Sequence, residues 1–569
     1  MRRVAQDGFT RPPTSTSPDK ALFVSTITLA VSASRQMPTQ LLFLPFELLL
    51  LIVQYLDWTD ILRLRQVLYE ATRERAVVQN LVVRYCTMFP ATAFSLDRPI
   101  SMHTTEQLEH IIRRNEAAHR GWDINAPHLN APFVPKKREI HLNYVAKTFC
   151  LIEGGRWLLV VRITGSVDYY DLEDEGSVSK TLIPDLAQRR PWTMVLVATD
   201  RDYNEPVLTF NMAIYTRTWL GFVAEQLQVW RITLELDDNH SGVGLVASHV
   251  VTLSLGTEYT PSDISLCGKY IAWDYVERVD NVCLNVVNWM DAAISNQAKI
   301  NSTYGSTPVK TTIGKKVVHP APEMPAFRLL PGNFAIIASR PTIRLYDLSA
   351  IPDSLVDDVS TGQPTPHIWE TSLPSLFPPS LSNYFLCLKT STVRFAVYTR
   401  NTVHGLIFPL RRNSTSERER LISSEPAGMS YTAPRICQLA RYVVNSEQCG
   451  FSSGYRTAVL HTFEPQTVII RYRWPDDVPD RDTSSNSNTV AGRGGLKERN
   501  FMSPSDVPWG AHLPRREDTF LPQGMQQKMI PITCRNWSPF TPVMDEGSGR
   551  VIYSAQTGKQ LVVADFSRY

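Results

Sequence analysis

The segments CLIEGGRWLLVVRITGSVDYYDL (150–172) and RLLPGNFAIIASRPTIRLYDL (328–348) share one design. Each has a turn, an apolar run, a polar turn and a second run that ends in Tyr-Asp-Leu. Short runs rich in Val, Ile, Tyr and Trp, bounded by Gly, Pro, Asn or Asp, are typical of β-strands. The two segments therefore predict the same strand–turn–strand unit, used twice.

Five further segments have this shape and bring the number of copies to seven: 210–234, 265–289, 394–410, 438–463 and 543–566. A four-stranded unit of this kind alone has bare edges and a one-sided core, and stacking units round a ring satisfies both. We therefore predict that 140–569 is a large all-β domain, a β-propeller of about seven blades. Two β-sandwich domains are the competing architecture.

One spacing between copies is wider than the others. It contains DDVPDRDTSSNSNTVAGRGGLKERN (476–500), which is polar and low in complexity. Such composition is typical of a flexible loop or linker, and we expect one inside the β domain. The copies also lack the Gly-His and Trp-Asp pairs of WD repeats, so the prediction is a divergent, WD-repeat-like propeller.

The composition sets limits on function. The chain has 569 residues, is 43% hydrophobic and has a net charge of +3, which indicates a globular protein without the electrostatic footprint of a nucleic-acid-binding one. None of its eight cysteines has CxxC spacing, and its histidines show no metal-ligand pattern, so we expect no metal site and no cofactor. Free thiols are typical of a reducing compartment, the cytoplasm or the nucleus.

The N-terminal part divides into three regions. Residues 1–40 begin with a polar, proline-rich stretch and are expected to be disordered, with Met37 a candidate alternative start. Residues 41–85 form a small helical module, since leucines recur there at helical spacing behind Pro45. The apolar run in it contains Pro45 and Glu47, so we expect no membrane segment. Residues 86–139 form a helical linker, with one amphipathic helix predicted at 103–120.

The helical module has three expected parts. The first helix follows Pro45, the second follows a cap at Thr59 or Asp60, and the third covers Glu70 to about Arg84. About forty residues in short helices bury little apolar surface. The excess of leucine therefore predicts a partner helix or a partner protein.

The segment LPFELLLLIVQYLDWTDILRLRQV (44–67) resembles an F-box, with matches that include Leu44, Pro45, Glu47 and Asp60. After Val67 about three residues of the family pattern are missing. The resemblance implies a substrate receptor of an SCF-type ubiquitin ligase, which is not itself an enzyme. It would dock on a Skp-type adaptor, and through it on a cullin, while the β domain would bind an unknown protein substrate. The residues that the resemblance assigns to adaptor docking are Leu44, Pro45, Leu48, Ile52, Leu56, Leu62 and Val67.

Two alternatives remain open. In the first, the F-box is degenerate and the propeller is an interaction scaffold outside any ligase. In the second, the β domain is a secreted serine hydrolase, because Gly450–Gly454 matches the G-x-S-x-G pattern. A β-like run follows that motif, so a hairpin turn is the favoured interpretation, with His461 a strand residue. We expect no catalytic residue. Glu173-Asp174-Glu175 is predicted to be a solvated turn.

Overall fold

The computed structural model describes two compact units of the chain, 1–83 and 84–569, and each is considered by itself. The predicted disordered segment 1–40 and the predicted loop 476–500 lie outside the described residues. The described residues are 44–53, 56, 58–65, 69–88, 96–122, 135–174, 176, 178–185, 193–218, 226–255, 261–278, 281–302, 313–321, 325–355, 363–372, 380–387, 390–399, 402–409, 434–441, 448–462, 467–475, 526–530, 542–555 and 558–567.

The first unit is helical. Leu49 and Val53, one turn apart, are both buried, so the apolar face of the first helix points into this unit. The second helix begins at Trp58, slightly earlier than predicted, and Asp60 pairs with Arg63 (3.1 Å) in its first turn. Two helices replace the predicted third one. The bounds are α3 (Phe46–Val53), α4 (Trp58–Leu64), α5 (Tyr69–Arg73) and α6 (Arg75–Met88), and α6 crosses the boundary between the units.

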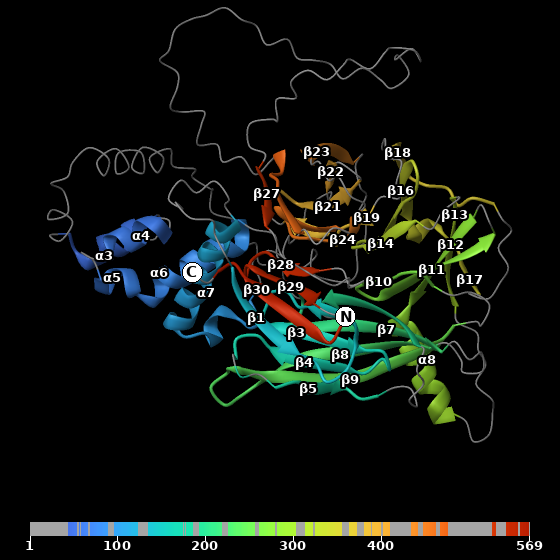
Figure 1. Ribbon diagram of the computed structural model, residues 1–569, viewed down its shortest axis with the longest axis horizontal. Coiled ribbons are helices and arrows are strands. Elements are labelled where there is room, and N and C mark those ends of the chain that lie inside the picture. The colour runs from blue at the N-terminus through green and yellow to red at the C-terminus, as the bar shows by residue number, and fades with distance from the viewer. Residues whose placement is uncertain are drawn as a thin grey trace, which may run out of the picture. The chain divides into compact units, whose positions relative to one another are not determined.

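The second unit contains seven antiparallel sheets, and these are the blades of a β-propeller. The predicted fold class is therefore confirmed, and the two β-sandwiches are ruled out. Figure 1 shows the blades following one another along the chain, from cyan at β3 to red at β30.

The first four blades begin in chain order, and blade 3 also takes up a short strand at 353–355, which follows three strands of blade 4. Blade 1 contains β2 (Ala146–Leu151), β3 (Trp157–Arg162), β4 (Val167–Asp171) and β5 (Lys180–Ile183). Blade 2 contains β6 (Thr193–Arg201), β7 (Thr209–Thr218), β8 (Gln226–Leu236) and β9 (Gly242–Ser254). Blade 3 contains β10 (Ile264–Cys267), β11 (Tyr270–Arg278), β12 (Asn281–Asn288), β13 (Ile313–Pro320) and β17 (Asp353–Leu355), and α8 (Trp289–Ser302) follows β12. Blade 4 contains β14 (Ala326–Leu330), β15 (Phe334–Ala338), β16 (Thr342–Asp347) and β18 (Trp369–Ser372), with the short helix η2 (Leu348–Ala350) after β16.

The last three blades complete the ring. Blade 5 contains β19 (Ser380–Leu381), β20 (Phe385–Cys387), β21 (Thr392–Tyr398), β22 (Thr402–Pro409) and β23 (Arg435–Arg441). Blade 6 contains β24 (Gln448–Ser453), β25 (Thr457–Thr462), β26 (Thr467–Arg471) and β27 (Gln526–Ile530). Blade 7 contains β28 (Val543–Asp545), β29 (Arg550–Ala555), β30 (Gln560–Asp565) and β1 (Lys136–His141).

Strand β1 closes the ring. It comes from the start of the second unit and pairs antiparallel with β30, from Lys136 opposite Asp565 to His141 opposite Gln560. Figure 1 shows these two strands side by side. Closure removes the free edge that β30 would otherwise expose.

The core of the second unit is shared between blades. Its large buried clusters among the described residues each join two neighbouring blades, and together they cover all seven interfaces. The cluster between blades 1 and 2, for example, contains Trp157 and Leu159 from one blade and Phe210 and Ile232 from the other. Each blade is therefore stabilised by its neighbours, as expected for a ring.

The repeated Tyr-Asp-Leu has a structural explanation. The residue after the third strand of a blade donates its backbone N–H to the carbonyl before the second strand, as Leu172 does to Arg156 (2.8 Å) and Leu348 to Asn333 (2.8 Å). The aspartate before it accepts a hydrogen bond from the backbone two residues on: Asp347 from Ser349 at 2.8 Å. The same backbone bond occurs in blades 3, 6 and 7, and in blade 2 its donor is Leu234, two residues before the end of the third strand.

The G-x-S-x-G motif forms a hairpin, as predicted. Strand β24 ends at Ser453, and Gly454 donates its backbone N–H to the carbonyl of Thr457 (2.7 Å) at the start of β25. Ser452 lies within β24, where its Oγ accepts a hydrogen bond from the backbone of Met544 (3.1 Å). His461 is a residue of β25. The motif is therefore a strand end and has no helix behind it.

Candidate functional site

The residues expected to dock the adaptor lie on α3, on α4 and beside them. Leu48 is 46% exposed and Leu62 is 37% exposed. Pro45 is also exposed, whereas Ile52 and Leu56 are half-buried. Leu44 packs against the small cluster formed by Leu49 and Ala71, so it contributes to the inside of the module. Val67 lies outside the described residues.

Exposed apolar side chains are concentrated in the helical unit. Among the described residues, the first unit has six large exposed hydrophobic side chains within 44–83, and the far larger second unit has eight. Single exposed apolar residues are normal, but several on one small module indicate an interaction surface. The six are Phe46, Leu48, Leu51, Leu62, Tyr69 and Val83.

A second candidate site lies in the propeller unit, beneath the helix α7 (Thr105–Trp122). The predicted helix at 103–120 is confirmed with slightly later bounds. Thr104 and Gln107 form a capping box: Thr104 N–H donates to Oε1 of Gln107 (2.8 Å), and Gln107 N–H donates to Oγ1 of Thr104 (3.3 Å). This reciprocal pair explains why the helix begins where it does.

Helix α7 is fixed to blade 7. Trp122 stacks on Phe566 with 4.4 Å between ring centroids, and its indole N–H donates to the carbonyl of Glu546 (3.0 Å). About two turns earlier, Asn115 donates to the carbonyl of Gly547 (3.2 Å). Gly121 lies so close to the Phe566 carbonyl that an added Cβ would be 2.0 Å from it, so a side chain there would push the helix away.

Between α7 and the turns of blades 1, 2 and 7 is a cavity of about 500 Å³. This volume is within the usual range for small-molecule sites. Apolar side chains from four segments form part of its wall: Leu96, Ile111, Trp157 and Leu208.

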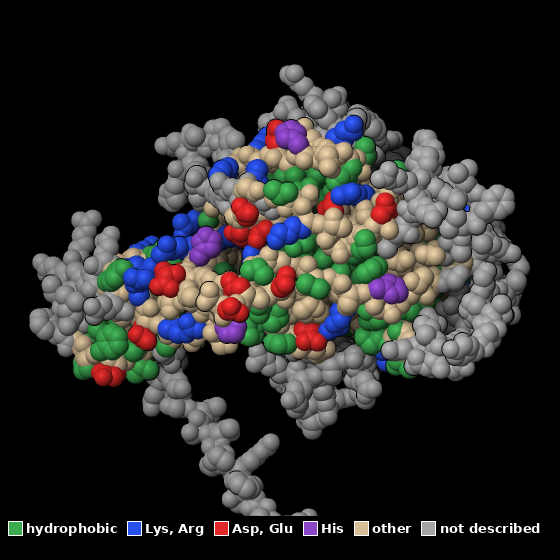
Figure 2. All heavy atoms as spheres, turned by 90° about the horizontal axis from the view of Figure 1, so that it is seen from below, with side chains coloured by type: hydrophobic (Ala, Val, Ile, Leu, Met, Phe, Trp, Pro, Cys, Tyr) green, Lys and Arg blue, Asp and Glu red, His purple; other side chains and the backbone are tan. Residues whose placement is uncertain are grey.

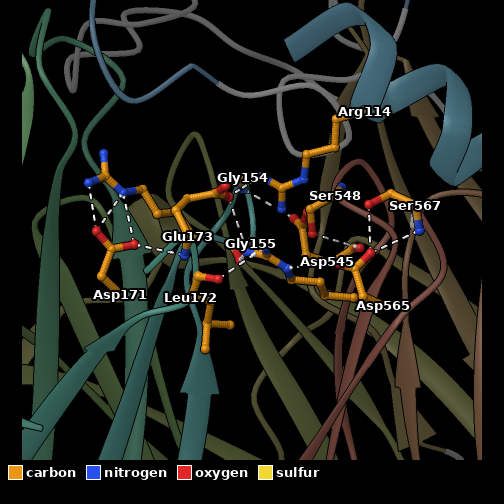
Figure 3. Close-up of polar contacts among 12 residues, drawn as sticks. Arg114, Gly154, Gly155, Asp171, Leu172, Glu173, Asp545, Ser548, Asp565 and Ser567 are labelled. Carbon is orange, nitrogen blue, oxygen red and sulfur yellow. Dashed lines mark hydrogen bonds and ion pairs between the residues drawn. The ribbon is translucent and has the colours of Figure 1, made fainter. Parts of the chain in front are cut away.

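Arg114 extends from α7 to blade 1 and pairs with Glu173 (Figure 3). Arg550 pairs with the same carboxylate (3.2 Å) and with Asp565 (3.4 Å). Burial lowers the pKa of Arg114, and the charge of Arg550 lowers it further. Burial would raise the pKa of Glu173, but Arg114 and Arg550 outweigh it, so the pKa is lowered and the carboxylate stays charged. The prediction of a solvated turn at Glu173 was therefore wrong, because α7 lies over that turn; Asp174 beside it is at the surface.

The aspartate of the first Tyr-Asp-Leu binds Arg156, a residue that lines this cavity. Asp171 accepts hydrogen bonds from Nε (3.1 Å) and Nη2 (2.7 Å) of Arg156, in the two-pronged geometry that an arginine and a carboxylate prefer. The Arg156 guanidinium lies over the Trp157 ring, 4.4 Å from its centroid. It also pairs with Asp97 (3.4 Å). All three guanidinium nitrogens of Arg156 therefore have carboxylate partners within the protein.

Arg98, unlike Arg156, has few partners for its guanidinium group among the described residues. It is only 6% exposed, yet no carboxylate pairs with it in the described part of the chain. Its Nη2 donates to the neutral amide oxygen of Gln107 (3.2 Å), while Nε and Nη1 have no hydrogen-bond partner. Nε and Nη2 of Arg114 and the indole N–H of Trp157 also lack a partner there. Buried donors of this kind are uncommon in proteins and need an explanation.

The central channel of the propeller forms a further cavity, of about 300 Å³. Asp200 lies there and accepts hydrogen bonds from the Gly268 backbone (2.6 Å) and the Tyr384 hydroxyl (3.3 Å). Burial raises its pKa to about 7. Glu153 nearby accepts from Tyr203 (2.9 Å). These acids are bonded within the protein, and none of the described side chains that line the channel has a buried unsatisfied polar atom like those of Arg98.

Other features add nothing further to the site. Acidic and basic side chains are interspersed over the face in Figure 2, with apolar ones scattered between them. Within the described ranges there is no group of three metal-ligating side chains placed to hold an ion, and none of the six cysteines whose side chains are described there forms a disulfide. No helix in that part of the chain has the length and apolar character needed to cross a bilayer.

Sequence reasoning missed the cavity. The helix that carries Arg114 was predicted only as amphipathic, and Arg98, Arg114 and Trp157 were not singled out. The one local feature of the sequence that points to the cavity is the capping pair Thr104 and Gln107, because the capping hydrogen bond also places the Gln107 side chain beside Arg98.

Comparisons with known proteins show no family for this chain. No protein-family model matches the chain, and no curated protein does. Among solved structures, it is similar to the β-propeller domain of Cps50 (Swd1) from Myceliophteria thermophila, with 9% identity, 76% of this chain and 99% of that chain covered, and a TM-score of 0.38. It is also similar to a chain of the mitotic checkpoint complex, with 8% identity, 78% of this chain and 98% of that chain covered, and a TM-score of 0.34. A third similar structure is the WD40 domain of SCAP from fission yeast, with 10% identity, 76% of this chain and 98% of that chain covered, and a TM-score of 0.34.

Proposed function

We propose that the chain is the substrate receptor of an SCF-type ubiquitin ligase. In this proposal the helical unit docks on a Skp-type adaptor, which connects it to a cullin, and the propeller unit binds the protein to be ubiquitinated. The observation that carries the proposal is the exposed apolar surface of α3 and α4, on a segment that resembles an F-box.

The two faces of α3 support this assignment. Leu49 and Val53 are buried and hold the module together, while Leu48 and Leu51 on the same helix are exposed. A helix that is apolar on both faces needs a second surface to cover it. A partner of matching apolar character, here the adaptor, would bury Leu48 together with Leu62 of α4.

The propeller unit would supply the substrate-binding surface. Its turns and loops project from a rigid ring, which is where binding residues are commonly placed. The rate of ubiquitin transfer would then come from proximity, because the receptor holds a substrate lysine near the charged conjugating enzyme. The receptor contributes no catalytic side chain in this scheme, and it would act in the cytoplasm or the nucleus.

Affinity capture of the full-length chain tests the proposal. The tagged protein and a Leu48→Asp, Leu62→Asp variant are captured from cells, and the adaptor and cullin are quantified by mass spectrometry. These two positions are preferable to Leu44, which packs inside the module, because their substitution leaves the buried residues untouched. We expect recovery of both partners with the wild type and a loss of at least tenfold with the variant.

Val246→Asp is the matched control. Val246 is also an exposed apolar residue (53%), but it lies on β9 of blade 2. The control should recover adaptor and cullin as the wild type does. Recovery of neither partner by the wild type, or equal recovery by the double variant, would contradict the ligase assignment and favour the interaction scaffold.

A further inference from the structure

The cavity beneath α7 presents hydrogen-bond donors without acceptors. Among the described residues, two nitrogens of Arg98, two of Arg114 and the indole nitrogen of Trp157 lack hydrogen-bond partners, and all three side chains line the cavity. Leaving a buried donor unsatisfied costs about 1–3 kcal/mol, and more for a charged group. A ligand that brings only acceptors would satisfy them.

The charge of Arg98 points to an anion. Its side chain is buried, and its one hydrogen-bond partner within the described residues is the neutral amide of Gln107. Buried charges in proteins are normally paired, because an isolated one loses its hydration without compensation. Arg114 by contrast already has Glu173, which holds one edge of its guanidinium and leaves the other edge without a partner.

The remaining charges of the cavity favour one negative charge over two. Four carboxylates of its wall already accept hydrogen bonds or pair with cations within the protein: Asp97, Glu153, Glu173 and Asp545. With Glu106, the wall has five carboxylates, which is more than its three guanidinium groups, those of Arg98, Arg114 and Arg156. A dianionic phosphate would be repelled more strongly than a carboxylate, whose two oxygens also match the planar fork of an arginine.

We propose that this cavity binds an organic carboxylate attached to a short apolar group. The carboxylate lies between Arg98 and Arg114, and the apolar group contacts Leu96, Ile111, Trp157 and Leu208. The ligand is either a free small acid or an acidic side chain of a bound protein. All of these residues are in 84–569, whereas the residues proposed for adaptor docking are in the helical unit.

Calorimetric titration of the full-length chain with sodium hexanoate tests the site, with hexanamide and hexyl phosphate at the same ionic strength as comparison probes. We expect hexanoate to bind, and both other probes to bind at least tenfold more weakly, since a hydrogen bond to a charged group is worth about 10–100-fold in affinity. No binding of hexanoate, or tighter binding of hexyl phosphate, would overturn the assignment.

Arg98→Gln is the decisive variant, and Arg113→Gln is its matched control. Arg113 is one residue from Arg114 on α7, but its side chain is 57% exposed and pairs with Glu109 on the same helix. Hexanoate affinity should fall at least tenfold in Arg98→Gln and stay unchanged in Arg113→Gln. Equal affinity in both variants, with both folded by circular dichroism, would refute the site.

Two tetrapeptides distinguish the sources of the carboxylate: acetyl-Ala-Ala-Leu-Glu-amide and its Gln counterpart. Stronger binding of the Glu peptide than of hexanoate, lost in Arg98→Gln, would identify a protein side chain. Binding of hexanoate alone would identify a small acid, and either result supports a carboxylate site. Arg98→Gln should capture the adaptor as the wild type does. A failure of the carboxylate site can therefore be distinguished from a failure of the ligase proposal.

Discussion

Two buried polar side chains of the propeller unit contrast sharply. His319 is fully buried between blades 3 and 4, and both of its ring nitrogens are bonded: Nδ1 with the Tyr346 hydroxyl (2.8 Å) and Nε2 with Ser339 (2.9 Å). Arg98 is also buried, but most of its N–H donors have no partner in the part of the chain that the structure describes. A satisfied polar network stabilises a fold, whereas an unsatisfied one is retained for another reason, such as a ligand.

Trp122→Ala should have the largest effect, because it removes the anchor of α7 and opens the cavity around Arg98 to water. We expect the free energy of unfolding to fall by about 3–5 kcal/mol, as is typical when a large buried aromatic residue is truncated. Urea denaturation followed by circular dichroism measures it. A change of less than 1 kcal/mol would mean that α7 is not held by this stacking contact.

His319 should make the stability of the propeller depend on pH. Burial lowers its pKa to about 3, and Arg344 and His367 contribute to the decrease. Between pH 6.5 and about 3, the unfolded chain binds a proton that the folded one does not, so stability falls as the pH falls through this window. From pH 6.5 to 5 the loss is about 2 kcal/mol for this group.

Urea denaturation at pH 6.5 and 5 measures how the free energy of unfolding changes with pH, and this change should be smaller in His319→Asn. Asp200 has the opposite effect on stability: its pKa is raised to about 7, so the stabilisation that it contributes falls as the pH rises from about 4 to 7. The effect of His319 is therefore measured as the difference between the variant and the wild type, in which the effect of Asp200 cancels. An unchanged slope in His319→Asn would show that His319 already binds a proton in the folded state.

Arg98→Met should increase stability in the absence of ligand. Methionine has a similar length but leaves no charge or unpaired donor in the cavity wall. We expect a gain of about 1–2 kcal/mol in the free energy of unfolding, since apolar replacement of poorly compensated buried charges is often stabilising. A loss of stability would mean that Arg98 is as well satisfied as His319, and would weaken the case for a ligand site.

Asp347→Ala should have the smallest effect. Its carboxylate accepts the Ser349 N–H (2.8 Å) at the start of η2, in an exposed turn where water competes for the same groups. We expect a loss of about 0.5–1 kcal/mol, measured by the same urea titration. A loss as large as that of Trp122→Ala would show that the turns, and not the interfaces between blades, determine stability.

The blades could be predicted from sequence because each one repeats the same local chemistry. The Tyr-Asp-Leu of blades 1 and 4 marks a turn whose backbone hydrogen bonds lie within about fifteen residues, so the pattern is visible along the chain. Gly450–Gly454 was interpreted correctly for the same reason, because the strand that follows it is adjacent in sequence.

The cavity could not be predicted in this way. Arg98, Arg114, Trp157 and Asp545 come together only when the ring closes, and they are up to about 450 residues apart. Strand β1 was likewise not recognised as a strand, because KKREIH alternates weakly and its partner β30 is at the other end of the domain. Helix α7 looked solvated on one face for the same reason: the surface that covers Arg114 belongs to distant turns.

The pairing of β1 with β30 also determines when the protein can finish folding. About 430 residues separate Lys136 from Asp565, and at about 5–20 residues per second their synthesis takes roughly 20–90 s. Throughout that time the nascent chain carries β1 without its partner, together with a growing arc of blades whose last edge is open. The protein is therefore exposed to aggregation during translation for far longer than its local elements take to fold, and its yield should depend on chaperones that shield open β edges until the last strand leaves the ribosome.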